Sequence, residues 1–279
     1  MGMDRGILEE AMWQFAADCG MRPEKGKKGQ VRIGSRPWLP EQGHMTGEAY
    51  GELVREYMER ETGMVPRLYE NCDPFFREIV CMGEAWIRAD ERLEDWCRKE
   101  YEGKKPEWFG QFSDLKRLDR KLGAFGRQIL DVRLHFLPSE EAAECLPAAP
   151  AGVEAVWYEG EGLEDLRRHY VFKHALCSSP LCPCMLAVAA VADGRPVGIA
   201  GATADCRNLW QIGVDVLPRW EGRGIGPWLT ALLGAGLRKR GVIPFYAVSQ
   251  SHTASMNTAL RAGFLPAWSE VYVGRGRSL

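Results

Sequence analysis

The sequence predicts an α/β (α+β) protein of two domains, and three features indicate this class. Apolar runs with short links between residues 186 and 216 predict consecutive antiparallel strands. Segments with apolar residues at helical spacing stand among the strand-like runs in both halves of the chain. A charged, proline- and alanine-rich stretch at 139–152 separates the halves. We therefore expect an N-terminal α/β domain over 1–145, and over 152–279 a domain with a mixed, largely antiparallel sheet flanked by helices.

The N-terminal half alternates between helix and strand patterns. Apolar residues at helical spacing predict helices at 7–19, 47–61, 90–101 and 113–123. Strand-like runs lie within 75–89 and at 129–137. Glycine and lysine residues at 23–29 predict a loop, and Asn-Cys-Asp-Pro at 71–74 predicts a turn.

The C-terminal half shows strand, turn and helix patterns in a regular order. Apolar runs predict four strands, at 186–192, 197–204, 209–216 and 242–249. The first two are joined by Asp-Gly-Arg-Pro at 193–196, a turn sequence typical of an antiparallel hairpin. Helical spacing predicts a helix that begins near Ile225. A glycine-rich turn therefore joins the third strand to this helix.

That turn, at 221–226, reads Glu-Gly-Arg-Gly-Ile-Gly. Gly222, Gly224 and Gly226 carry no Cβ, so backbone N–H groups can approach a bulky anion closely. The following helix adds unpaired N–H groups and the positive end of its dipole. The pattern predicts a cradle for a pyrophosphate group.

Two nucleotide-binding folds use similar cradles, and the sequence lacks residues that each of them needs. A P-loop requires Gly-Lys-Ser/Thr, whereas Ile225 and Gly226 follow Gly224 here. A dinucleotide fold requires an acidic residue after the next strand, which here ends Ser-Gln-Ser-His at 249–252. The sequence therefore disfavours a protein that binds NAD or ATP at this turn.

The order of these elements resembles the GNAT superfamily of acyl-CoA-dependent N-acyltransferases. Its members carry Arg/Gln-x-x-Gly-x-Gly/Ala at the strand-to-helix turn, and 221–226 fits except at the first position. The resemblance implies a second helix at 255–262, and Gly-Phe at 263–264 matches the glycine–aromatic pair that usually ends that helix. The resemblance covers about 153–273. The residues at 210–218 and 266–270 are similar to those of a group of uncharacterised bacterial GNAT proteins with an extra N-terminal domain.

The resemblance implies an enzyme, an N-acetyltransferase that moves an acetyl group from acetyl-CoA to a primary amine by direct transfer in a ternary complex. It implies that the CoA pantetheine arm runs between the strands that end near Val216 and Ser249. The residues expected to bind the cofactor are Val214, Val216, Gly222, Arg223, Gly224, Ile225, Gly226, His252 and Ser255. The N-terminal domain would select the acceptor substrate or be a degenerate acyltransferase-like fold.

Asp215, Ser251 and His252 are the candidate catalytic residues. Asp215 would act as a base or orient the amine, or else cap groups near the strand end. His252 would move a proton near neutral pH or only bond the pantetheine arm. The tyrosine that usually protonates the CoA thiolate falls at Ala259, and Glu221 replaces the usual Arg or Gln. These departures support an alternative: a catalytically weak CoA-binding sensor or regulatory module.

Composition excludes several other partners. The chain of 279 residues has 36 basic and 38 acidic side chains, a net charge of −2, which disfavours nucleic acid and an anionic membrane surface. No apolar run reaches transmembrane length, and the N-terminus does not read as a signal peptide. We expect a cytoplasmic protein, a monomer or homodimer, that acts on a small-molecule amine or a protein amine.

Cysteine is frequent in the chain, with nine residues. Cys177, Cys182 and Cys184 lie close to His174 in sequence, which raises the question of a zinc site. Their spacing is not that of a zinc finger or ribbon, and structural sites usually show two separated ligand pairs. We therefore expect free thiols and no metal.

Overall fold

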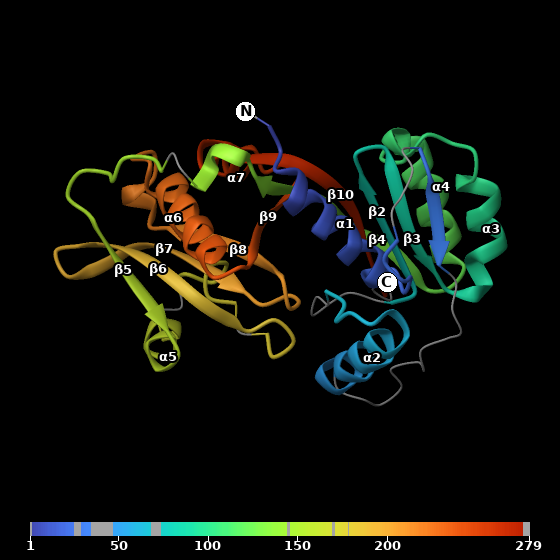
Figure 1. Cartoon of the computed structure of the whole chain (residues 1–279), viewed down its shortest axis with the longest axis horizontal. Coiled ribbons are helices and arrows are strands. Elements are labelled where there is room, and N and C mark those ends of the chain that lie inside the picture. Colours follow the sequence, from blue (N-terminus) through green and yellow to red (C-terminus); the bar gives the residue numbers. More distant parts are fainter. Residues whose placement is uncertain are drawn as a thin grey trace. The chain divides into compact units, whose positions relative to one another are not determined.

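The structure is a computed structural model that describes residues 2–24, 29–34, 47–67, 74–143, 146–168, 171–177 and 179–275. The chain forms two compact units, and Figure 1 labels most of their helices and strands. Unit 1 consists of Met1–Leu8 and Phe136–Pro266, and unit 2 of Glu9–His135 and Ala267–Leu279. In the described residues, no helix combines the length and the apolar character needed to cross a membrane.

Unit 1 contains the strand order β9-β8-β7-β6-β5. These strands are β5 (Glu154–Glu159), β6 (Cys184–Ala192), β7 (Arg195–Thr203), β8 (Leu209–Val216) and β9 (Ile243–Ser249). Neighbours from β5 to β8 are antiparallel, whereas β9 runs parallel to β8. The helices of this unit are α5 (Glu161–Arg167), α6 (Ile225–Lys239) and α7 (Thr253–Arg261), with short 3₁₀ turns at Glu140–Ala143 and Pro218–Trp220. The predicted fold class, a mixed and largely antiparallel sheet with flanking helices, is confirmed.

Unit 2 contains the strand order β1-β3-β2-β10-β4. These strands are β1 (Val31–Gly34), β2 (Phe76–Cys81), β3 (Glu84–Ala89), β4 (Arg127–Pro138) and β10 (Phe264–Arg275). The helices are α1 (Arg5–Asp18), α2 (Gly47–Thr62), α3 (Glu91–Tyr101) and α4 (Phe112–Gly123), with a 3₁₀ turn at Pro106–Trp108. The four predicted helices and the predicted strand at 129–137 are confirmed. Most of the loop expected at 23–29 and of the turn expected at 71–74 lies outside the described residues.

The two units divide the chain differently from the expected boundary between 145 and 152. Residues 267–279 belong to unit 2, although they were expected in the C-terminal domain. The reason is the antiparallel ladder of β10 with β2, which runs from Trp268 opposite Cys81 to Val271 opposite Glu78. A pairing between such distant parts of the chain leaves no trace in local composition.

Two hairpins have the same turn, and the sequence indicated only one of them. Asp193 and Gly194 between β6 and β7 have positive φ values of 50° and 71°, as the two-residue hairpin turn requires. Met82 and Gly83 have φ values of 48° and 80° and join β2 to β3. The single strand-like run expected at 75–89 is therefore a hairpin, which was missed because methionine is not a turn residue.

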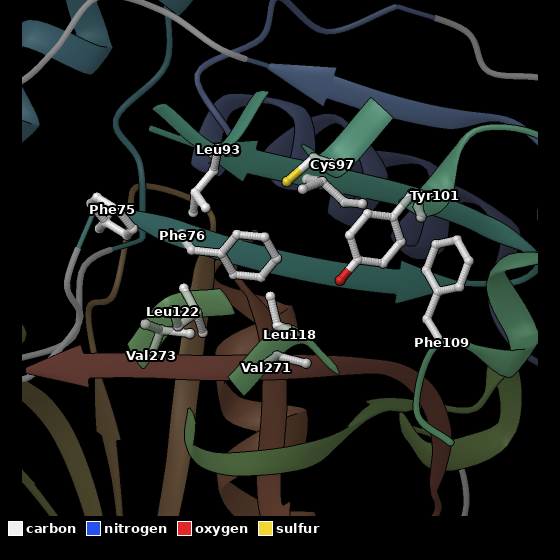
Figure 2. Packing of buried hydrophobic residues seen from close by; sticks show 13 residues of the cluster. Phe75, Phe76, Leu93, Cys97, Tyr101, Phe109, Leu118, Leu122, Val271 and Val273 are labelled. Atoms are coloured by element: carbon white, nitrogen blue, oxygen red, sulfur yellow. The ribbon is translucent and has the colours of Figure 1, made fainter. Parts of the chain in front are cut away.

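An apolar cluster packs between the unit 2 sheet and the helices α3 and α4 (Figure 2). Phe76 of β2, Leu93 of α3, Leu118 of α4 and Val271 of β10 are each at most 3% exposed. Burying such a side chain contributes on the order of 1.5–3 kcal/mol before entropy is subtracted. These contacts hold the helices on the sheet and form the core of this unit.

Buried ion pairs join residues of unit 2 that are far apart in sequence. Arg67 is fully buried, and its Nε lies 2.6 Å from Asp18 Oδ2. Arg77 Nε donates to Glu270 Oε1 at 2.6 Å. Burial raises the pKa of the Glu270 carboxyl, but the guanidinium groups of Arg77 and Arg67 outweigh this and lower it to about 2. Removal of one partner would leave an uncompensated buried charge.

Glu78 places a carboxyl group inside the apolar cluster. It lies on β2 opposite Ile87 of β3 and Val271 of β10, and it is 3% exposed. The Tyr101 hydroxyl forms a hydrogen bond with it, whereas Oε2 has no partner among the described residues. Burial raises the pKa of this carboxyl to about 7, more than the Tyr101 hydrogen bond lowers it.

We expect Glu78→Gln to remove a pH-dependent loss of stability. The pKa is raised in the folded state from 4.5 to about 7, so the wild-type free energy of unfolding falls as pH rises through this range. At 1.36 kcal/mol per pKa unit the loss approaches about 3 kcal/mol. Urea unfolding near both ends of the range measures it, with the exposed Glu107→Gln as control. The same fall in the Glu78→Gln protein would contradict this assignment.

Candidate functional site

β8 and β9 pair with each other only over their first halves. The parallel register runs from Leu209 opposite Ile243 to Ile212 opposite Tyr246. Both strands continue beyond this point, to Val216 and Ser249, without a further ladder between them in this fully described stretch. On its other edge β8 stays paired with β7 as far as Val216. On the edge that faces β9, β8 therefore presents backbone groups within 213–216 that β9 does not bond.

The register with β7 shows which amides face this open edge. The Leu217 N–H donates to the Val197 oxygen at 2.9 Å, on the β7 side. Hydrogen-bonding groups alternate between the two edges of a strand, and the β7–β8 register contains no bulge. The N–H groups of Val214 and Val216 therefore point toward the β9 side, where pairing has ended. These are the two strand residues expected to bind the cofactor.

The glycine turn between β8 and α6 is open. Gly222 and Gly224 have positive φ values of 73° and 83°, and a Cβ added at either would meet no atom within 4 Å. Gly224 is the N-cap of α6, which has no side-chain cap, and the amides of residues 222–226 donate no hydrogen bond within the described part of the chain. The Arg223 guanidinium lies over the Trp220 ring at 4.6 Å. Several unpaired N–H groups at a helix start favour an anion.

Gly226 is buried in the first turn of α6, unlike the exposed residues 221–224. A Cβ there would lie 3.5 Å from the Thr258 side chain of α7 and 3.8 Å from that of Val216. Both are ordinary van der Waals contacts, so a methyl group would fit at this position. The predicted cradle residues are thus brought together, with open backbone at Gly222 and Gly224 and a buried first helical turn at Gly226.

Asp215 forms hydrogen bonds with a segment that lies before β6. Its Oδ2 accepts the backbone N–H of His174 at 2.8 Å and that of Ala175 at 2.9 Å. Its Oδ1 lies 2.7 Å from His174 Nδ1. Asp215 therefore caps two backbone N–H groups of this segment. Sequence reasoning considered His174 only as a metal ligand and missed this pair, whose members are 41 residues apart.

Two glycines explain how residues 174–175 reach the sheet. A Cβ at Gly201 of β7 would lie 1.8 Å from the Ala175 oxygen, and one at Gly213 of β8 would lie 1.9 Å from the His174 oxygen. Both contacts are impossible for any other residue, so the segment lies directly on the strands. A Cβ at Gly198 would instead meet Ile225 of α6 at 3.0 Å. Since side chains alternate between faces, the 174–175 segment lies on the face opposite α6.

The remaining predicted residues lie at the start of α7. Ser251 and His252 are exposed, and neither side chain has a hydrogen-bond partner among the described residues. Ser255 Oγ lies 3.0 Å from the Tyr246 hydroxyl, at the position where β9 leaves β8. Burial raises the pKa of Tyr246, which keeps its hydroxyl protonated. Tyr246 was not predicted as a site residue, although it is the only tyrosine in the strand expected at 242–249.

The cysteines near His174 are free thiols. Cys182 and Cys184 are buried, and Cys177 is half-buried. Burial raises the pKa of the Cys184 thiol to about 11. The described residues contain no cluster of three or more His, Cys, Asp or Glu side chains with the geometry to hold a metal ion.

Comparisons with known proteins gave similar folds but no close relative. No family model and no curated protein matches the sequence. Solved structures with a similar fold include a GCN5-related N-acetyltransferase from Kribbella flavida (22% identity, TM-score 0.44, 58% of this chain and 64% of that chain). Another is a GCN5-related N-acetyltransferase from Sphaerobacter thermophilus (18%, 0.41, 61% and 59%). A tandem GNAT protein from the clavulanic acid biosynthesis pathway also matches (17%, 0.39, 56% and 58%).

At these identities and scores the similarity carries no functional conclusion. A functional proposal for this chain therefore rests on its own residues and their geometry.

We expect Gly213→Ala to displace the 174–175 segment and destabilise the protein. The added methyl group would overlap the His174 carbonyl oxygen, at 1.9 Å. Overpacking of this kind costs about 1–3 kcal/mol. Gly162→Ala in α5 is the control, because the new Cβ would make an ordinary contact of 3.6 Å with the Tyr158 side chain of β5. Chemical denaturation compares the two variants, and equal stabilities would contradict the close approach.

Proposed function

We propose that this protein is an N-acetyltransferase that moves an acetyl group from acetyl-CoA to a primary amine by direct transfer in a ternary complex. One observation carries the proposal: β8 leaves β9 at Ile212 and then leads directly into the open glycine turn of α6. A strand edge with free amides and a helix start with free amides thus follow each other along the chain. A ligand with an amide-containing arm and a pyrophosphate fits both.

The glycine turn would hold the pyrophosphate. The unpaired amides at 222–226 and the positive end of α6 supply the attraction. Pro227 has no N–H and removes one donor, although proline is sterically suited to a first helical turn. Glu221 adds a negative charge, which the neighbouring Arg219 and Arg223 offset.

The edge of β8 would hold the rest of the cofactor. The amides of the pantetheine arm can bond the strand as another strand would, and the N–H of Val214 or Val216 can polarise the thioester oxygen. Such a donor stabilises the oxyanion that forms when the amine attacks. His252 and Ser255 at the start of α7 would contact the arm, and Ser251 lies beside them. The acceptor would be a small-molecule amine or a protein amine.

A second candidate is a CoA-binding sensor with little catalysis. Two features favour it: Ala259 stands where the usual proton-donating tyrosine is expected, and Glu221 places a negative charge beside the phosphates. Both candidates require the same cradle. They differ only in whether the bound thioester reacts.

Calorimetry with acetyl-CoA, followed by thiol release in the presence of a panel of primary amines, tests the proposal. We expect binding of acetyl-CoA and thiol release that depends on at least one amine. Binding without amine-dependent release would favour the sensor. Preferential binding of NAD or ATP would contradict both candidates.

We expect Gly224→Glu to weaken CoA binding by at least about tenfold, or about 1.4 kcal/mol. Its side chain would enter the open space of the cradle and bring a negative charge to the phosphates. Gly241→Glu is the matched control, because Gly241 also has a positive φ, of 74°, and open space around its Cβ, but lies beyond the C-terminal end of α6. Both changes strain the backbone alike. Equal affinities of the two variants would remove the cradle assignment.

A further inference from the structure

We infer that His174 accepts the proton of the attacking amine and that Asp215 is the positioning residue that holds its imidazole. This inference rests on the proposed function. It differs from the expectation that Asp215 itself is the base. It also gives a role to the contact between Asp215, a predicted site residue, and the His174 imidazole.

Asp215 is poorly placed to take a proton from substrate. Its Oδ2 already accepts two backbone N–H groups, from His174 and Ala175, and its Oδ1 faces His174 Nδ1 at 2.7 Å. Its side chain is only 15% exposed. A general base must offer a lone pair within hydrogen-bond distance of the amine. Asp215 offers its lone pairs to His174 and Ala175 instead.

The His174 imidazole has the features that Asp215 lacks. With Nδ1–H donated to the carboxylate, the neutral ring leaves its lone pair on Nε2. The His174 side chain is 85% exposed, and Nε2 has no partner among the described residues. A carboxylate behind Nδ1 fixes the tautomer, orients the ring and stabilises the imidazolium that forms.

The position of the pair relates it to the open edge of β8. Asp215 stands between Val214 and Val216, whose N–H groups face the side that β9 has left. Its side chain and the 174–175 segment lie on the face of the sheet opposite α6. A thioester held along this edge would therefore have oxyanion donors in the strand and a proton acceptor on the next residue.

The neutral amine nitrogen forms a bond to the thioester carbon, and the carbonyl electrons move to oxygen. His174 Nε2 takes one proton from that nitrogen. The C–S bond then breaks as the carbonyl re-forms, CoA leaves as the thiolate and is protonated by solvent, and the imidazolium returns its proton to solvent. The products are an amide and free CoA.

Several other charged or titratable groups lie on the elements packed around this segment. In the described residues they are Lys173 and Cys177 of the segment itself, Asp215 of β8, Cys184 of β6, Arg195 of β7, four residues of α5 (Glu161, Glu164, Asp165 and Arg167) and three of β5 (Glu154, Tyr158 and Glu159). Arg167 donates to the Cys184 oxygen at 3.2 Å and pairs with Glu164. The buried Cys184 thiol, with a pKa of about 11, stays neutral around neutral pH. Asp215 is therefore the group in direct contact with the ring.

His174→Ala tests the inference with little damage to the fold. Both bonds to Asp215 Oδ2 come from backbone N–H groups, so the substitution leaves them in place. We expect kcat to fall about 100-fold or more, as for loss of a general base, and the acidic limb of the kcat–pH profile to disappear. Acetyl-CoA affinity should stay unchanged. Added imidazole should restore part of kcat, because the exposed site leaves room for it.

Asp215→Asn separates positioning from proton transfer. We expect kcat to fall at least as far as in His174→Ala, without rescue by imidazole. The Asn oxygen would take the two backbone N–H bonds and its NH2 would face His174 Nδ1, which leaves the ring proton on Nε2. Lys173→Gln is the control: an exposed neighbour that should keep wild-type kcat and its pH profile.

Two results would overturn the inference alone. One is a His174→Ala enzyme that keeps kcat and the acidic limb. The other is loss of the acidic limb in His252→Ala instead. A wild-type protein that releases no thiol with any amine is a different result, because it removes the proposed function and this inference together.

Discussion

The separation of β8 from β9 after Ile212 is the constraint on which the candidate site depends. Backbone groups inside a sheet are normally bonded on both edges, and an interrupted ladder leaves donors and acceptors that need partners. Here β7 holds β8 in place up to Val216, so its free edge is fixed in geometry. A ligand that bonds this edge would meet preorganised donors and would not have to order them.

Glycine has two separate functions around this strand. Gly222 and Gly224 leave space open for a ligand. Gly201 and Gly213 instead allow residues 174–175 to lie directly on the sheet. Gly201 and Gly213 thus allow His174 to reach Asp215, although residues 171–177 form no helix or strand. The two faces of β8 thus differ: one packs under α6, and the other carries a carboxylate and an imidazole in contact.

The sequence predicted well those features that depend on local pattern. Apolar runs located the strands from 186 to 249, because β6, β7 and β9 are buried along most of their length, and helical spacing located α6. The Met82–Gly83 hairpin was missed because its turn has one weak residue. The ladder of β10 with β2 and the contact of His174 with Asp215 were missed because both join residues far apart in sequence. The contact of Tyr246 with Ser255 was missed because the two residues lie on different elements.

The burial of the cysteines has a practical consequence for chemical work on this protein. Thiol reagents attack the thiolate, and burial raises the pKa of the Cys81 and Cys97 thiols to about 12. Cys177 is half-buried, whereas the other cysteines that the structure describes are buried. Labels and cross-linkers added to the native protein should therefore modify Cys177 before any other described cysteine, and would stand three residues from His174.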